Sequence, residues 1–202
     1  MAINFSIQNL LTIVSALYPL FIVSFLVLAS IFNMTPLKGI TYLGGITTSY
    51  ILWALVAKLW NKTRDRNAPH SCTLFNLYGN YKWPSVDVII TFFTFVYLII
   101  PMFEFNHQIN WVVLSVLLIL NILHMVFQCE KKCSDLPGVI LGLVFGSLFG
   151  LGWWAIFWSS GNQHLLFYNE LVSNNAVCNK PAKQRFKCSV YRNGEIISSS
   201  IA

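Results

Sequence analysis

Residues that could carry out acid, base or nucleophilic chemistry gather in three short segments, 58–70, 84–87 and 131–138. Between them, the segments supply the following candidates: Lys58, Arg66, Pro84, Ser85, Asp87, Lys131 and Asp135, with His70 beside them. Each segment lies at the boundary of an apolar stretch. Ionisable groups at the boundaries of a membrane bundle are the default candidates for a functional site.

The composition indicates which kind of fold must position these residues. Of 202 residues, 56% are hydrophobic and only 10% are charged, and the mean hydropathy is +0.63. A soluble domain has about 25% charged residues. So few charges cannot coat the surface of a soluble protein of this size, and the composition therefore predicts a polytopic membrane protein.

Five apolar stretches approach the roughly 20 helical residues that cross a hydrocarbon core of about 30 Å. We predict spans at 11–32, 38–60, 86–103, 111–128 and 136–158. The predicted fold class is therefore an all-α polytopic membrane protein with about five transmembrane helices in a bundle over 1–158, followed by an extramembrane polar tail over 159–202.

Small residues predict close helix packing in two spans. Gly138, Gly142, Gly146 and Gly150 recur at every fourth position of the fifth span and form a stripe on one helical face. Such a stripe lets another helix approach closely. The second span mixes glycine, serine and threonine with large residues, which predicts that it lies inside the bundle.

The positions of the basic residues predict the orientation. With five spans, the N-terminus and the loops 61–85 and 129–135 share one side of the membrane, and most span-flanking Lys and Arg lie there. Cytosolic loops carry an excess of Lys and Arg. We therefore predict a cytosolic N-terminus and a C-terminus on the opposite side. Because the net charge of +6 is distributed around spans and in the tail, we expect no nucleic-acid partner.

The tail carries its own pattern. Alternating residues on both sides of Asn193-Gly194 predict a short β-hairpin within 186–197. An isolated hairpin is marginal in water, so it must dock or be stapled. Cys178 and Cys188 could form a disulfide in an oxidising compartment, and free thiols in a reducing one are the alternative.

In order and placement, the three segments resemble the signature regions of the type 2 phosphatidic acid phosphatase family, whose members are helical-bundle enzymes that remove phosphate from lipid phosphates. The first family motif is a Lys followed, after six intervening residues, by Arg-Pro. The second motif is Pro-Ser-Gly-His. The third motif is Ser-Arg, then a His after five intervening residues, then an Asp after three more. The resemblance covers roughly 10–158. Lys58 matches the first Lys, Arg66 lies one position beyond the expected Arg, and Pro84 and Ser85 match the second motif.

The resemblance also shows which catalytic groups are replaced. Asp87 stands where the family has its general-acid His. Aligning Asp135 with the family's Asp places Lys131 at the nucleophilic His. A protonated lysine cannot replace an imidazole nucleophile at neutral pH. Chemistry retained on this fold would have to use His70 or His124 from a different position.

The tail offers a second resemblance. The string from Cys178 to Glu195 is similar to C-terminal modules on membrane proteins of large DNA viruses that infect algae and protists. This resemblance implies a virion membrane protein whose tail contacts other membrane or capsid proteins. Phe186, Tyr191 and Arg192 are the expected contact residues.

The remaining polar residues predict neither a metal site nor a cofactor. Cys129 and Cys133 are separated by three residues with no second pair nearby, which favours free thiols or lipidation over a zinc site. We expect His124, within the fourth span, to face the bundle interior and to hydrogen-bond a neighbouring helix.

These observations favour a non-enzymatic integral membrane protein. We expect a structural, anchoring role in a bilayer, in the setting of the inner membrane of a large icosahedral virion, with contacts through the loops and the tail. The alternative is a lipid phosphate phosphatase or lipid-handling enzyme with displaced catalytic residues. A small transporter or channel subunit is a third hypothesis, although the spans lack a file of polar residues.

Overall fold

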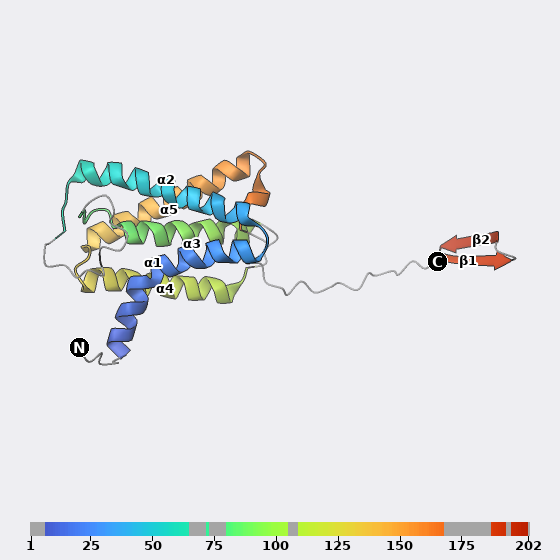
Figure 1. Ribbon diagram of the computed structural model, residues 1–202, viewed down its shortest axis with the longest axis horizontal. Helices are drawn as coiled ribbons and strands as arrows, with labels where there is room; N and C mark the ends of the chain where they lie inside the picture. Colours follow the sequence, from blue (N-terminus) through green and yellow to red (C-terminus); the bar gives the residue numbers. More distant parts are fainter. Residues whose placement is uncertain are drawn as a thin grey trace.

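A computed structural model describes residues 7–64, 72, 80–104, 109–167, 187–192 and 195–201, and it describes side chains in the first four of these ranges from Ile13 onward. Its helices are α1 (Ile7–Phe32), α2 (Pro36–Trp60), α3 (Val86–Glu104), α4 (Trp111–Glu130) and α5 (Leu136–Ser159), followed by the short 3₁₀ helix η2 (Gln163–Leu165). Figure 1 shows the five long helices side by side in one bundle.

All five long helices are long and apolar enough to cross a membrane, as the sequence predicts. Their bounds coincide with the predicted spans at five of the ten ends and extend them by one to four residues at the other five. The predicted multi-pass helical class is thus confirmed for the described part of the chain.

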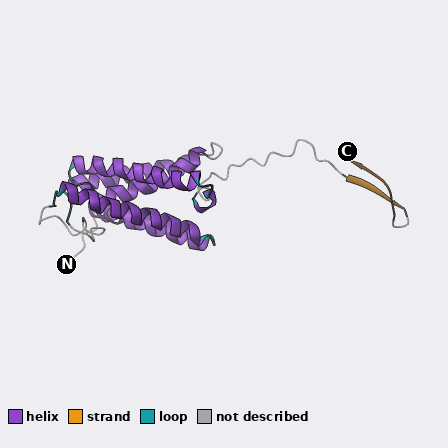
Figure 2. Ribbon diagram, turned by 90° about the horizontal axis from the view of Figure 1, so that it is seen from above, coloured by secondary structure: helices purple, strands orange, loops and turns teal. Residues whose placement is uncertain are grey.

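The central helix is α3, not α2. In α3, 67% of the most apolar window is buried inside the bundle, against 28% for α2. Each of the other four long helices contacts α3, and Figure 2 shows the helices gathered into one elongated bundle. The prediction that the second span lies inside the bundle is therefore wrong, because the small residues of α2 permit close contact along one face only.

The glycine stripe of α5 lies directly against α3. A Cβ atom built on Gly142, Gly146 or Gly150 would lie 2.6 to 2.8 Å from a backbone oxygen of Ser85, Ile89 or Phe93, in that order. Those three carbonyls are themselves four residues apart. The two backbones therefore touch along three helical turns, with no room for a side chain between them.

An aromatic cluster packs the end of the bundle that lies away from the α2–α3 connection. It consists of Tyr42, Phe93, Tyr97 and Phe167, with Leu166 beside them. The Tyr42 hydroxyl is 2.7 Å from the Thr94 hydroxyl. Since Leu166 and Phe167 are fully buried, the packed bundle continues past the end of α5 to residue 167.

The strands β1 (Lys187–Arg192) and β2 (Glu195–Ile201) pair antiparallel, with Arg192 opposite Glu195 and a bulge between Val190 and Tyr191. The described residues do not include Cys178 or Phe186, nor the side chains of Cys188, Tyr191 and Arg192. The predicted tail disulfide and tail contacts thus lie outside the described part of the chain.

Candidate functional site

The segment that resembles the second phosphatase motif begins α3 and is held by its backbone. The Trp53 indole of α2 donates a hydrogen bond to the Pro84 carbonyl at 2.8 Å. The Ser85 amide donates to the Gly138 carbonyl in α5 at 3.0 Å. Pro84 and Ser85 therefore connect three helices, and the buried Ser85 side chain faces the packed interior.

Asp87 is the second residue of α3, and its side chain points inward. It is 4% exposed, and its Oδ2 accepts a hydrogen bond from Gln128 Nε2 at 3.0 Å. An isolated carboxylate in an apolar interior is costly, so it requires a donor or an opposite charge. Gln128 on α4 supplies the donor.

The hydrogen-bonded chain continues along α4. Gln128 Nε2 is 3.4 Å from Nε2 of His124, one helical turn earlier. Both neighbours of this amide nitrogen are acceptors, so the nitrogen must face them and Gln128 Oε1 must point away. His124 is 1% exposed, which confirms that it faces the interior.

The hydrogen-bonded chain ends where His124 binds a backbone carbonyl of α1 that a proline leaves without its usual helical donor. Its Nδ1 is 2.7 Å from the Ser15 carbonyl of α1. That carbonyl would normally accept from the amide four residues later, but that residue is Pro19, which has no N–H. Because a carbonyl only accepts, Nδ1 carries the proton, and in the neutral ring Nε2 is the acceptor that faces Gln128.

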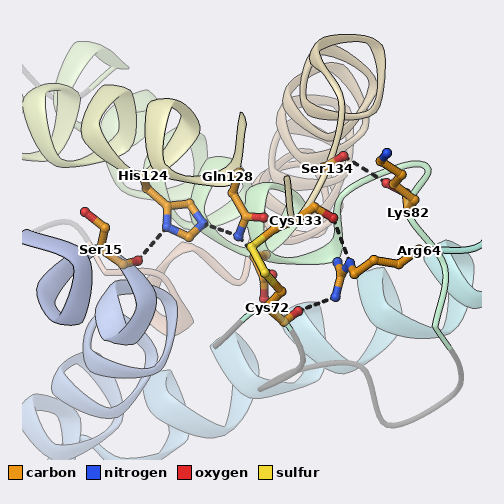
Figure 3. Close-up of a disulfide and its surroundings, with 9 residues drawn as sticks. Ser15, Arg64, Cys72, Lys82, His124, Gln128, Cys133 and Ser134 are labelled. Atoms are coloured by element: carbon orange, nitrogen blue, oxygen red, sulfur yellow. Dashed lines mark hydrogen bonds between the residues drawn. A yellow bond between two sulfur atoms is a disulfide. The ribbon is translucent and has the colours of Figure 1, made fainter. Parts of the chain in front are cut away.

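Arg64 and a disulfide lie beside this chain (Figure 3). Cys72 and Cys133 are bonded, with their Cα atoms 5.2 Å apart. Arg64 Nε donates to the Cys133 carbonyl at 2.7 Å, and Nη1 donates to the Cys72 carbonyl. One guanidinium therefore holds the backbones of both bonded cysteines.

The charge of Arg64 is buried and is balanced by Asp87. Only 5% of the Arg64 side chain is exposed. Burial lowers the Arg64 pKa from its usual value, and the negative charge of Asp87 acts in the opposite direction. A guanidinium starts so far above neutral pH that it stays protonated. The site thus contains a fixed cation beside a buried carboxylate.

The other candidate residues lie outside this network. Asp135 precedes α5, and its Oδ1 forms an ion pair with Lys82 Nζ at 2.7 Å. About half of the Asp135 side chain is exposed. Lys131 follows the last residue of α4. Lys58 lies exposed in the last turn of α2. Arg66 and His70 lie outside the described residues.

The structure therefore brings together Asp87 and His124 from the sequence candidates, while Ser85 is held separately against α5, and it adds partners that sequence analysis missed: Ser15, Arg64, Cys72 and Gln128. One signal was available. Asn121, His124 and Gln128 lie three and four residues apart on one face of an otherwise apolar helix, and all three are buried. Cys133, expected as a thiol, is instead paired with Cys72.

The arrangement holds no recognisable catalytic group pair among the described residues. The imidazole is tied to a backbone carbonyl and an amide, and Asp87 is tied to the same amide. No group of three His, Cys, Asp or Glu side chains in the described ranges could hold a metal ion. What the network does is join α1, α3, α4 and two loops by buried polar contacts.

Comparisons with protein-family models, with curated proteins and with solved structures find no match to this chain.

Proposed function

We propose that this chain is a non-enzymatic integral membrane protein whose role is structural: it anchors in a bilayer and presents its loops and tail to neighbouring proteins. One observation carries the proposal. Three of the positions that match the phosphatase motifs are engaged here in contacts between helices or their connections. Asp87 accepts a hydrogen bond from Gln128, the Ser85 backbone amide donates to the Gly138 carbonyl, and Asp135 pairs with Lys82.

The exterior of the bundle supports an anchoring role. Large apolar side chains are exposed on its surface, among them Phe21, Phe32, Leu59, Trp111 and Leu148. Such a surface suits contact with acyl chains. The tail resembles modules on viral membrane proteins. We therefore propose that the chain lies in the inner membrane of a large DNA virus, with other membrane or capsid proteins as partners.

Phosphate release from a lipid phosphate tests the absence of activity. We expect purified protein in detergent micelles containing phosphatidic acid to release no more phosphate than protein-free micelles, and the same result for the His70→Asn and Asp135→Asn variants. Phosphate release that either variant abolishes would overturn the proposal and favour the displaced-site phosphatase. The Glu130→Gln variant, which neutralises an exposed carboxylate outside the motif positions, is the matched control.

Truncation tests the role of the tail. A chain ending after Phe167 keeps the buried Leu166 and Phe167, so the bundle should still insert and fold. We expect this truncated chain to enter membranes at the full-length level but to lose its association with neighbouring proteins, as measured by crosslinking in the membrane. Unchanged crosslinking would contradict a role for the tail.

A further inference from the structure

The Cys72–Cys133 bond lies at one end of the bundle, between the α2–α3 connection and the α4–α5 connection (Figure 3). Disulfides form and persist in oxidising spaces such as the lumen of the endoplasmic reticulum, the cell exterior or the periplasm. The cytosol keeps thiols reduced. The presence of the bond therefore indicates which side of the membrane this end of the bundle occupies.

The bond is built into the fold. Both cysteines are fully buried, and Phe127 and Ala16 pack against them. Arg64 donates to the carbonyls of both cysteines and so holds the two loops at bonding distance. Two thiols lose two electrons and two protons as the S–S bond forms. A thiol–disulfide oxidoreductase accepts them, since its own disulfide is reduced to a dithiol.

Three of the basic residues at this end are engaged in the fold, which weakens them as a guide to orientation. Arg64 is buried beside Asp87. Lys82 pairs with Asp135, and the Lys62 ammonium lies 5.9 Å from the centre of the Trp83 ring. The excess of Lys and Arg in cytosolic loops is a statistical bias. A covalent bond that needs an oxidant is the stronger constraint.

We propose that the end of the bundle carrying Cys72–Cys133 faces an oxidising compartment, so that the residues before α1 lie on that side and the tail after α5 lies in the reducing cytosol. This orientation is the reverse of the one expected from the basic residues. It goes beyond the structural role proposed above, because it assigns the partners of the tail to the cytosolic face. It also assigns free thiols to Cys178 and Cys188.

The chain contains three Asn-x-Ser/Thr sequences: Asn4-Phe5-Ser6 before α1, and two that the proposed orientation assigns to opposite sides of the membrane. Asn33-Met34-Thr35 follows α1, and Asn61-Lys62-Thr63 follows α2, so they lie at opposite ends of the bundle. Both match the Asn-x-Ser/Thr acceptor pattern, and both asparagines are exposed. In the proposed orientation Asn61 lies on the lumenal side and Asn33 on the cytosolic side. A glycan on Asn33 would therefore overturn the proposal.

Terminal reporters decide the orientation whether or not any native site is occupied. A short glycosylation-acceptor cassette is fused before residue 1 in one protein and after residue 202 in another, and both are expressed in eukaryotic cells with the native acceptors removed by Asn4→Gln, Asn33→Gln and Asn61→Gln. We expect only the N-terminal cassette to gain a glycan that endoglycosidase removes. Glycosylation of the C-terminal cassette would overturn the proposal.

Counting thiols tests the chemistry behind the orientation. Cells are treated with a permeable alkylating agent before lysis, and disulfides are then reduced and the released thiols tagged with polyethylene glycol maleimide. With five cysteines and one bond, we expect two tags. No tag means that the bond is absent, and four tags mean that the tail is oxidised too; either result overturns the proposal. The Cys72→Ser/Cys133→Ser chain, expected to gain no tag, identifies the bonded pair.

Discussion

The two ends of the bundle are held by different chemistry. At the disulfide end, which comprises Arg64, Cys72, Asp87, Gln128 and Cys133, buried polar groups and one covalent bond join the loops. At the aromatic end, stacked and edge-on rings join α2, α3 and the chain after α5.

Because of this difference, the stability of each end should respond to different conditions. Aromatic packing depends on shape and apolar area and is indifferent to redox state. Buried charges are stable only while their partners are present, and removing one partner leaves the other uncompensated. We therefore expect substitutions at the disulfide end to have the larger effects, to be coupled to one another and to depend on oxidation.

The largest loss should follow Arg64→Met. This change leaves two carbonyls without their donor and the Asp87 carboxylate without a nearby cation. Each buried acceptor left without its donor costs about 1–3 kcal/mol, so the two carbonyls alone account for roughly 2–6 kcal/mol. We expect a fall of that size in the free energy of unfolding in detergent, whereas the exposed Lys58→Met control should fall by less than about 0.5 kcal/mol.

A second substitution separates charge balance from lost hydrogen bonds. In the Arg64→Met/Asp87→Asn chain the uncompensated carboxylate is gone, so the double change should cost less than the sum of the single changes. Costs that simply add would show that Arg64 and Asp87 are independent, which would contradict the balance inferred for this end.

The next largest effect should come from the disulfide. Cys72 and Cys133 are 61 residues apart, and a bond that closes a loop of this order stabilises a protein by about 2–4 kcal/mol. We expect the Cys72→Ser/Cys133→Ser chain to lose that amount and to become insensitive to reductant. A wild-type unfolding midpoint that stays constant in reductant would contradict the contribution of the bond.

A smaller effect is expected at the aromatic end. Tyr42→Phe keeps the ring contacts with Phe93, Tyr97 and Phe167 but removes the hydrogen bond to Thr94. The lost bond should cost about 1 kcal/mol. The loss should be the same with and without reductant, as measured by chemical unfolding of both states. A loss that appears only after reduction would show that the two ends are coupled.

The two ends also differ in how much the sequence could predict. Apolar run length is a local property, and it located all five helices. Four-residue spacing is local too, and it placed the α5 glycines on one face. The buried position of His124 was predicted correctly, because an ionisable group within a membrane span is costly in lipid and therefore faces the bundle interior.

The disulfide end could not be predicted in the same way, because its partners are far apart in the chain. Nothing local to Cys72 indicates Cys133, and Cys133 has a nearer cysteine at position 129 that misled the prediction. In the sequence, Arg64 is one of several basic residues in a loop, and its burial is a property of the tertiary structure alone. The choice of α3 over α2 as the central helix depended on packing, which small residues permit but do not dictate.

The smallest effect should come from the second charge pair at the disulfide end, which lies at the surface. Lys82 and Asp135 are 2.7 Å apart, closer than many buried pairs, yet about half of the Asp135 side chain is exposed. Exposed pairs contribute about 0.2–1 kcal/mol and are screened by salt. We expect Lys82→Gln to lower the free energy of unfolding by no more than that, with the difference from wild type vanishing in high salt. A loss as large as that of Arg64→Met would show that proximity, rather than burial, sets the value of a charge at this end of the bundle.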